Sequence, residues 1–349
     1  MDNQAALSEI NKLKAKLDAV QLPAQLMEKA VEQIERINLS LKYGGNLSQL
    51  DVTTKYIDLI TNLPWNARTQ DILDINRVKE TLDKNHFGLE KIKSRIMEYM
   101  SILIMQKQRL NAELFHAPSL FFVGLAGTGK TTFAISLAEA LGRRFIRIPF
   151  GGLSSALDLR GQSKLSPESE PGMVIKALRR VGSRNPVILL DELDRVAPET
   201  RTSVMGVLLE LLDPGQNRNF TDYFLDYPFD LSEVIFVATA NNTSNVATAV
   251  LDRLELIQMP SYTDEEKIHI GKNYILPKYL KEVGLTPDMV RIEDSVWVIL
   301  IRALGFEPGI RSLERLIETL VRKIAFKIVS GQGTQFAINE TNMREYVPL

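Results

Sequence analysis

The stretch GLAGTGKT at residues 124–131 decides the fold, because it fits the phosphate-loop pattern G-x-x-x-x-G-K-[ST] between an apolar strand candidate and a helix candidate. The glycines allow backbone N–H groups to surround phosphate oxygens, and the N-terminus of the following helix adds the positive end of its dipole. Lys130 is expected to reach the β- and γ-phosphates of a nucleotide, and the Thr131 hydroxyl to ligate Mg²⁺. A chance glycine-rich turn is the alternative, and the flanking strand and helix argue against it. The stretch predicts nucleotide-binding roles for Gly124, Leu125, Ala126, Gly127, Thr128, Gly129, Lys130, Thr131 and Thr132.

A second motif consists of four apolar residues and two acids, VILLDE at residues 187–192. A buried strand that stops at Asp191 would deliver a carboxylate to the Mg²⁺ shell. Glu192, one residue later, would activate the attacking water as a general base. A strand followed by a solvated acidic turn is the alternative, since Asp194 follows as well. The position downstream of a phosphate loop favours the catalytic interpretation.

A third apolar run, FVATAN at residues 236–241, ends in an amide. If its strand lies beside the strand of Glu192, Asn241 could hold the lytic water by hydrogen bonds. A turn asparagine is the alternative, because Asn242 follows directly. This segment by itself leaves both interpretations open.

The composition is that of a globular chain too long for one ordinary domain, with 349 residues, 45% hydrophobic and 24% charged. The formal net charge of −1 argues against a dedicated nucleic-acid binder, which is normally basic. No apolar run is long enough to cross a membrane, and the first residues lack the pattern of a signal peptide. We therefore expect a cytoplasmic protein without a membrane partner. The absence of cysteine excludes disulfides and thiolate chemistry, and the three histidines have no metal-ligand spacing.

Three patterns follow one another along the chain. Apolar residues at helical spacing predict an N-terminal helical bundle at residues 1–82. Short apolar runs that alternate with amphipathic segments predict an α/β nucleotide-binding domain at 83–261, in which helices cover a parallel sheet. The capping-box pattern TDEE at 263–266 then begins a helical lid domain at 262–349.

Beyond these local motifs, the chain resembles one family closely, the ATPase module of the Lon proteases within the AAA+ class. The specific strings, in family order, are NLPW at 62–65, HFGLEK at 86–91, the phosphate loop, PVILLDELD at 186–194, LLDPGQN at 211–217, LDR at 251–253 and GIRSLER at 309–315. The resemblance implies an AAA+ P-loop NTPase core that hydrolyses ATP with Mg²⁺ in a homo-oligomeric ring, a hexamer in the family. It also implies action on protein substrates or partners, and no nucleic-acid partner is expected.

The resemblance assigns roles that position alone does not. Asn241 corresponds to sensor 1. Arg253 corresponds to the arginine finger, which reaches the γ-phosphate bound by the neighbouring subunit, and Arg311 to sensor 2, by which the lid contacts the phosphate of its own subunit. Both guanidinium groups suit the charge on phosphoryl oxygens. Without the family, a solvated helix end would be the preferred interpretation for Arg253, and a lid surface position for Arg311.

The adenine environment is likewise implied by the resemblance. The segment His86, Phe87 and Gly88 is similar to the one that frames the base, and Tyr262 is a candidate second wall. Plain core packing is the alternative for Phe87 and Tyr262.

Two departures from the family are visible. A complete Lon continues into a peptidase domain with a serine–lysine dyad, so we expect no proteolytic site in this chain. In the loops expected to face a central pore, Ser166 and Pro167 stand where an aromatic–aliphatic pair is usual, and Thr200 replaces an aromatic residue before Arg201. Leu165 is the nearby apolar candidate for gripping a substrate. A small shift of the alignment in a tolerant loop is the alternative.

Three functions are therefore open. The first is a Lon-like ATPase ring that remodels protein partners. The second is the ATPase half of a split or truncated Lon-like protease, with a separate peptidase as partner. The third is a nucleotide-gated scaffold that does not thread substrate. The intact set of Glu192, Asn241 and Arg253 favours an active ATPase over a pure scaffold, whereas the altered pore loops favour the scaffold over the split protease.

Overall fold

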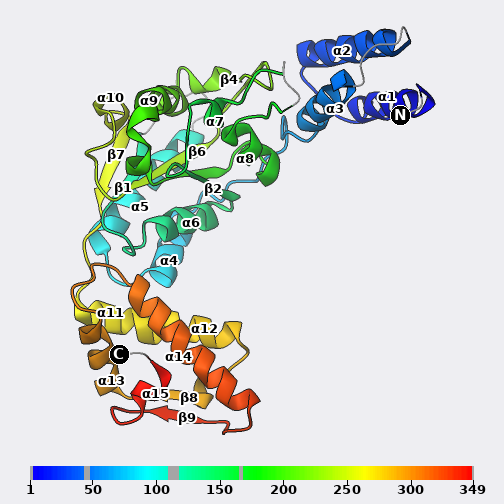
Figure 1. The fold of residues 1–349 in the computed structure, drawn as a ribbon. Coiled ribbons are helices and arrows are strands. Elements are labelled where there is room, and N and C mark those ends of the chain that lie inside the picture. Colours follow the sequence, from blue (N-terminus) through cyan, green and yellow to red (C-terminus); the bar gives the residue numbers. More distant parts are fainter. Residues whose placement is uncertain (1–2, 43–47, 109–117, 165–167, 348–349) are drawn as a thin grey trace.

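The computed structural model describes residues 3–42, 48–108, 118–164 and 168–347. Figure 1 shows helices near the N-terminus at the upper right, an α/β core beside them and a helical lid below the core. The predicted fold class is confirmed, since a parallel sheet covered by helices lies between an N-terminal helical part and a C-terminal lid. The limits of the three domains stay a prediction. No helix in the described ranges is long and apolar enough to span a membrane.

The centre of the core is a parallel sheet with the strand order β2-β3-β6-β1-β7. Its strands are β1 (Ser119–Val123), β2 (Phe145–Pro149), β3 (Val187–Asp191), β6 (Ile235–Ala240) and β7 (Leu254–Gln258). Every side chain of β3 is buried, as expected for a strand that is covered on both faces. Because the strands are parallel, the residues that follow β1, β3 and β6 meet at one edge of the sheet, where ligands of open α/β sheets bind.

Helices cover both faces of this sheet. One face is covered by α4 (Ile75–Asn85), α5 (Glu90–Gln108) and α6 (Lys130–Leu141). The other carries α7 (Leu157–Arg160), α8 (Met173–Val181), the 3₁₀ turn η1 (Leu193–Arg195), α9 (Pro198–Leu212), the 3₁₀ turn η2 (Asn217–Asn219), the hairpin of β4 (Phe220–Asp222) and β5 (Tyr227–Phe229), and α10 (Thr248–Leu251). Successive side chains of β1 point to opposite faces of the sheet. Leu120 and Phe122 pack against the face covered by α4–α6, and Phe121 and Val123 pack against the other face.

The N-terminal helices are α1 (Asn3–Asp18), α2 (Ala24–Lys42) and α3 (Ser48–Thr61). Their buried side chains belong to the same apolar cluster as the second face of the core. Tyr56 of α3 lies 6.4 Å from the ring of Phe224, and Trp65 lies 5.0 Å from the ring of Phe229, measured between centroids. Packing against the β4–β5 region therefore anchors these helices to the core.

The loop that was expected to face a pore leaves the core at Gly161 and returns at Gly172. The fully buried carboxylate of Asp222 accepts a hydrogen bond from the Gly172 N–H at 2.7 Å. The Gln162 N–H donates to the Glu170 carbonyl at 3.0 Å and closes the neck of the loop. A Cβ atom at Gly172 would lie 2.1 Å from the Leu159 carbonyl oxygen, so this close approach of two backbones requires glycine.

The residues on which the pore-loop prediction depends are only partly described. Leu165, Ser166 and Pro167 lie outside the described residues, so what we expect of them stays a prediction. Thr200 lies in the first turn of α9, where its hydroxyl donates to the Ala197 carbonyl at 3.4 Å.

The lid is a compact helical unit with its own apolar cluster. It consists of α11 (Asp264–Ile270), the π-helical turn η3 (Gly271–Ile275), α12 (Leu276–Glu282), the 3₁₀ turn η4 (Pro287–Met289), β8 (Val290–Ile292), α13 (Asp294–Ala303), α14 (Arg311–Val329), β9 (Phe336–Ile338) and α15 (Met343–Tyr346). The predicted capping box is present: the Thr263 hydroxyl accepts from the Glu266 N–H, and the Glu266 carboxylate accepts from the Thr263 N–H. This cap fixes the start of the lid directly after the core.

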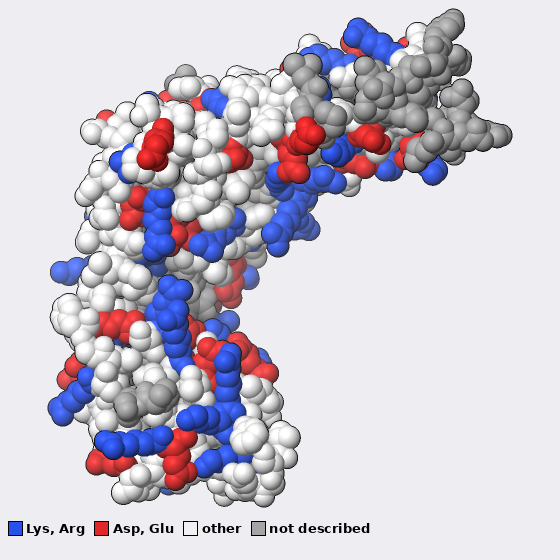
Figure 2. Space-filling model, in the orientation of Figure 1, with Lys and Arg blue, Asp and Glu red and all other residues white. Residues whose placement is uncertain are grey.

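Charges of both signs are interspersed on the face shown in Figure 2. The ion pairs Lys278–Glu314 at 3.2 Å and Lys327–Glu345 at 2.9 Å are examples from the lid. Exposed pairs of this kind contribute about 0–1 kcal/mol each. The stability of the fold therefore depends mainly on its apolar clusters.

Candidate active site

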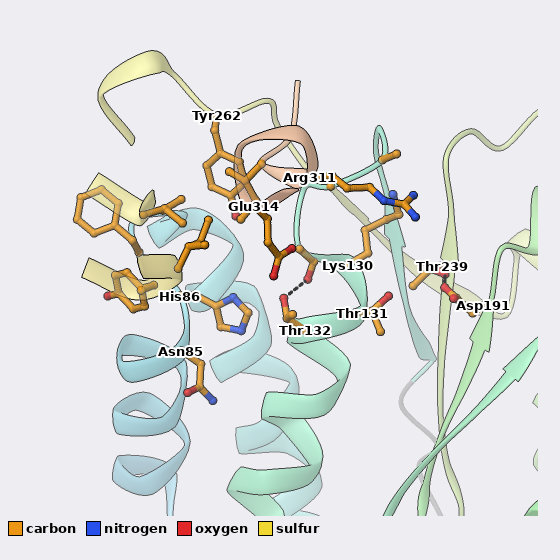
Figure 3. Close-up of a pocket in the computed structure, with 18 of the residues that line it drawn as sticks. Asn85, His86, Lys130, Thr131, Thr132, Asp191, Thr239, Tyr262, Arg311 and Glu314 are labelled. Atoms are coloured by element: carbon orange, nitrogen blue, oxygen red, sulfur yellow. Dashed lines mark hydrogen bonds between the residues drawn. The ribbon is translucent and has the colours of Figure 1, made fainter. Parts of the chain in front are cut away.

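A cavity of about 560 Å³ lies where the carboxyl edge of the sheet faces the lid. Its size is typical of a small-molecule site, for which roughly 300–1,000 Å³ is usual. Figure 3 shows that its walls come from the end of α4, the phosphate loop, the ends of β3 and β6, and the lid. The predicted site residues that line it are His86, Phe87, Ala126, Gly127, Gly129, Lys130, Thr131, Thr132, Asp191, Glu192, Asn241, Tyr262 and Arg311.

The phosphate loop has the backbone that its glycines allow. Gly127 and Gly129 have φ values of 81° and 93°, in the left-handed region that other residues rarely adopt. Gly129 is the N-cap of α6, which begins at Lys130, so the first N–H groups of that helix point toward the cavity. A Cβ atom at Gly127 would lie 3.2 Å from the backbone nitrogens of Ile310 and Arg311. The loop is therefore a cradle of donors that the lid closes from one side.

The ammonium group of Lys130 lies inside this cradle. Its Nζ atom donates to the Gly124 carbonyl at 2.5 Å, to the Leu125 carbonyl at 2.9 Å and to Oδ1 of Asn241 at 3.2 Å. Burial lowers the pKa of Lys130 below its ordinary value of 10.5, although Asp191 and nearby acids oppose this shift. A cation held so close to a ring of N–H groups suits phosphate oxygens.

The carboxylate of Asp191 ends β3 at the floor of the cavity and is 6% exposed. Its Oδ1 accepts a hydrogen bond from the Thr239 hydroxyl, and its Oδ2 lies 2.5 Å from Nε of Arg147. With the hydroxyl of Thr131 on the same cavity wall, Asp191 provides the oxygen ligands that Mg²⁺ prefers. Mg²⁺ usually takes one or two carboxylates together with substrate phosphates and water, so these residues fit the ion.

Glu192 occupies a strained backbone position at the same edge. Its φ of 61° and ψ of 50° lie in the left-handed region, which is uncommon for a residue other than glycine. The Glu192 N–H donates to the Thr239 hydroxyl at 3.1 Å, and this bond holds the turn. Its carboxylate lies 3.5 Å from Arg195 and lines the cavity. Strain of this kind is concentrated at functional sites.

Asn241 directs its side chain to the phosphate loop. Its Oδ1 accepts from Lys130, while its backbone N–H donates to Oδ2 of Asp194 at 3.1 Å. The strands β3 and β6 are direct neighbours, as the sensor interpretation required. Asn241 and Glu192 therefore line one cavity from adjacent strand ends.

The lid touches the phosphate loop directly. The Ile310 N–H donates to the Gly127 carbonyl at 3.2 Å, and a Cβ atom at Gly309 would lie 2.4 Å from the Ala126 carbonyl oxygen. Arg311, the first residue of α14, follows this contact, and Figure 3 shows it and Lys130 pointing into the same region of the cavity. Any rotation of the lid must therefore move the Arg311 guanidinium relative to the phosphate loop.

The expected base-binding residues combine core packing with cavity lining. Phe87 stacks on His269 of the lid at 3.6 Å between ring centroids and also lines the cavity. Tyr262 is 8% exposed, and its hydroxyl donates to the Thr128 carbonyl at 3.3 Å. Burial raises the pKa of Tyr262 to about 12, so this hydroxyl stays protonated. In this geometry Phe87 and Tyr262 can pack in the core and also contact a base in the cavity.

His86 lies at the other side of the expected base region and is 5% exposed. Its ring stacks on Phe133 at 3.7 Å between centroids, and its Nε2 lies 2.9 Å from Oγ of Ser136. Burial lowers the pKa of His86 to about 4, and the nearby Lys93 acts in the same direction. The folded chain therefore keeps this imidazole neutral.

The pKa of His86 predicts a pH-dependent stability. A folded-state pKa below the ordinary value of 6.5 means that the contribution is present above pH 6.5 and lost as the pH falls toward 4. Between about pH 7.5 and pH 5, the wild-type chain should lose about 2 kcal/mol of unfolding free energy relative to His86→Gln, which cannot titrate. Urea unfolding of both proteins at the two pH values measures this change. An equal pH dependence of the two proteins would contradict it.

Some predicted residues lie outside the cavity lining. In the described part of the chain, the cavity walls do not include Gly88, Gly124, Leu125 and Thr128. Gly88 has a φ of 62° and begins the turn into α5. A Cβ atom at Gly124 would lie 2.7 Å from the carbonyl oxygen of Met259, so a larger residue would not fit there. These residues shape the backbone of the site rather than its surface.

Arg253 also lies away from this cavity. It follows α10, where Nη2 contacts Oδ2 of Asp213 at 3.1 Å and Nη1 donates to the Ala249 carbonyl at 3.2 Å. Its side chain is 37% exposed. A single chain therefore places the expected arginine finger on its outer surface, away from its own phosphate loop.

Other cavity residues were missed by sequence reasoning. They are Asn85, Arg147, Thr239, Ala240, Ile270, Tyr274, Ile275, Lys278, Ile310 and Glu314. Two of them carried a signal: Thr239 is a polar residue inside an apolar strand, and Arg147 is a charged residue inside the apolar run FIRIP at 145–149. The lid residues carried none, since only folding brings them to the phosphate loop.

Comparison with known proteins agrees with this geometry. The model of the ATPase family associated with various cellular activities (AAA) matches residues 120–262, and that of the Lon protease AAA+ ATPase lid domain matches residues 281–336. Lon protease 2 of Thermus thermophilus is 39% identical over 345 residues, which cover 97% of this chain and 42% of that protein. The Lon protease of Heliobacterium modesticaldum is 40% identical over 335 residues, 96% of this chain and 40% of that protein. The chain thus spans about two fifths of the length of these relatives.

Proposed function

We propose that this chain, which is similar to Lon proteases over nearly its whole length, is an AAA+ ATPase of the Lon type that hydrolyses Mg-ATP in a ring of like subunits and acts on protein substrates or partners. One observation carries the proposal. A single cavity collects the phosphate loop with Lys130, the oxygen ligands of Thr131 and Asp191, and the polar side chains of Glu192 and Asn241. These are the parts that phosphoryl transfer to water requires.

Each residue has a defined task in this reaction. Lys130 and the N–H groups of the loop hold the phosphates, and Thr131 and Asp191 would hold Mg²⁺, which neutralises phosphate charge when bound. Glu192 accepts a proton from the attacking water, and the Asn241 amide orients that water. Arg311 donates hydrogen bonds to phosphate oxygens from the lid, which links the nucleotide to the lid position.

The ring is proposed from the position of Arg253 together with the family. Its guanidinium is partly exposed, lies outside the cavity of its own chain, and is held in place by Asp213. A surface arginine in a fixed position can complete the site of a neighbour, as arginine fingers supplied in trans do. Repetition of that contact in a closed ring, a hexamer by family resemblance, would give every site one finger.

This arrangement predicts that ATP hydrolysis depends on assembly. Specific ATPase activity should rise with protein concentration until the oligomer is saturated. Arg253→Ala should lower it by about ten- to a hundredfold, the value of a lost charge-assisted hydrogen bond of roughly 1.5–3 kcal/mol. An equal mixture of Arg253→Ala and Lys130→Ala subunits should recover activity, because about a quarter of randomly formed interfaces join an intact loop to an intact finger. Steady-state hydrolysis against concentration and mixing ratio measures both effects.

The matched control places both defects on one subunit. A mixture of Arg253→Ala with the double variant Lys130→Ala, Arg253→Ala has no intact finger and should show no recovery. Recovery in this control, or activity that is constant from monomer to oligomer, would be incompatible with a finger in trans.

The proposal that the chain acts on proteins rests on its similarity to the relatives. They are Lon proteases, and the matched part of each is about two fifths of its length. We therefore propose a motor that acts on proteins, and the ATPase half of a Lon-like protease with a separate peptidase as the second candidate.

A further inference from the structure

A cation already contacts the carboxylate that is expected to share the metal. Arg147 is the middle residue of β2, the strand next to β3, and its Nε atom lies 2.5 Å from Oδ2 of Asp191. The other carboxylate oxygen of Asp191 accepts from Thr239. Both oxygens of Asp191 therefore have partners within the folded chain.

The ion pair with Arg147 matters because the carboxylate of Asp191 is buried. Asp191 is 6% exposed, and a buried carboxylate is costly unless a cation or several donors compensate it. The ammonium of Lys130 donates to the loop carbonyls of Gly124 and Leu125 and to Asn241. Within the described part of the chain, Arg147 is the cation in ion-pair contact with Asp191.

A guanidinium in contact with Oδ2 of Asp191 competes with a metal ion for that carboxylate. Mg²⁺ requires near-octahedral geometry with ligands at about 2.0–2.1 Å, and it usually retains several waters. The guanidinium nitrogen at 2.5 Å from Oδ2 takes up one lone-pair direction of that oxygen, and its charge repels the ion. The side chain of Asp191 is 8% exposed and held by Thr239, whereas that of Arg147 is 49% exposed. Arg147 is therefore the partner that can move.

We propose that Arg147 is the counter-ion of Asp191 in the nucleotide-free chain and gives way when Mg-nucleotide binds, turning toward the phosphates in the same cavity. The inference rests on the proposed nucleotide site. Arg147 lines the cavity together with Lys130 and Glu192, so phosphate oxygens would come within reach of a planar guanidinium. Arg147 then has two opposite effects: it competes with Mg²⁺, and it supports phosphate binding when Mg²⁺ is absent.

A metal titration separates these effects. Binding of methylanthraniloyl-ADP is followed by fluorescence, first in EDTA and then at increasing Mg²⁺. In Arg147→Gln, affinity in EDTA should fall, and the Mg²⁺ concentration at half-maximal binding should also fall, by about five- to tenfold for a lost ion pair. Arg144→Gln is the matched control, because Arg144 contacts the carbonyls of Val181 and Gly182 and does not line the cavity. It should match the wild type in both measurements.

An unchanged or higher Mg²⁺ requirement in Arg147→Gln would overturn the inference, while normal binding of Mg-nucleotide by the wild type would leave the proposed function in place. A wild-type chain that binds no nucleotide would overturn both.

Thermal unfolding in EDTA without nucleotide gives an independent check. Arg147→Gln should lower the midpoint in the wild-type background and leave it unchanged in Asp191→Asn, and equal losses in the two backgrounds would also overturn the pairing. If Arg147→Gln fails to fold, Arg147→Met provides the same comparison.

Discussion

Replacement of Lys130 by alanine is expected to lower the affinity for Mg-ATP more than about a hundredfold, on the order of 3 kcal/mol. The ammonium lies in the phosphate cradle, where it contacts the loop carbonyls of Gly124 and Leu125 and the amide of Asn241. Without this ammonium, the negative phosphate oxygens would face the carbonyl and amide oxygens of the loop with no cation between them. Arg147 belongs to β2 and Arg311 to the lid, so each would reach the phosphates from outside the loop, and we expect neither to replace Nζ.

Isothermal titration with ATP and Mg²⁺ measures this loss directly. Lys272→Ala is the matched control, because Lys272 lies on the lid, pairs with Asp294 at 2.6 Å and does not line the cavity. It should bind ATP like the wild type. Unchanged affinity in Lys130→Ala, with the fold intact by circular dichroism, would remove the phosphate loop from the site.

The parts of this site that the sequence predicted are those set by local pattern. The spacing of glycines and Lys130 specifies a strand, a loop and a helix, and four apolar residues before Asp191 specify a buried strand that stops at an acid. Parallel pairing then places Asp191 and Asn241 at one edge without further information. Such motifs carry their own geometry because each is completed within a few residues.

The parts that the sequence did not predict depend on packing between distant segments. Arg147 and Asp191 are brought together by the register of β2 on β3, and Gly309 meets Ala126 across the core–lid junction. No local pattern encodes those distances. The role of Arg253 is of a third kind, since it concerns a neighbouring chain and neither the sequence nor a single subunit tests it. Leu165, Ser166 and Pro167 lie outside the described residues, so their effect on threading remains a prediction.

Replacement of Glu192 by glutamine should leave ATP bound and reduce turnover by about a hundred- to ten-thousandfold, the usual contribution of a general base. Glutamine keeps the length and shape of the side chain, and the turn at φ 61° is held by the backbone bond to Thr239, which the substitution does not touch. The lost contact to Arg195 joins side chains that are 33% and 54% exposed, so it is worth less than about 1 kcal/mol. The variant should therefore fold normally and lack only the proton acceptor.

Two measurements on the same preparation distinguish loss of the base from loss of the site. Steady-state phosphate release should be nearly abolished, while the affinity for ATP should remain within about threefold of the wild type, under 1 kcal/mol. Glu199→Gln is the matched control: it makes the same chemical change on the exposed first turn of α9 and should hydrolyse ATP at the wild-type rate. Because ATP would stay bound, the Glu192→Gln oligomer should also persist at lower protein concentration in size-exclusion chromatography with ATP. Hydrolysis at the wild-type rate would exclude Glu192 as the base, whereas loss of both ATP binding and hydrolysis would assign it to holding the nucleotide.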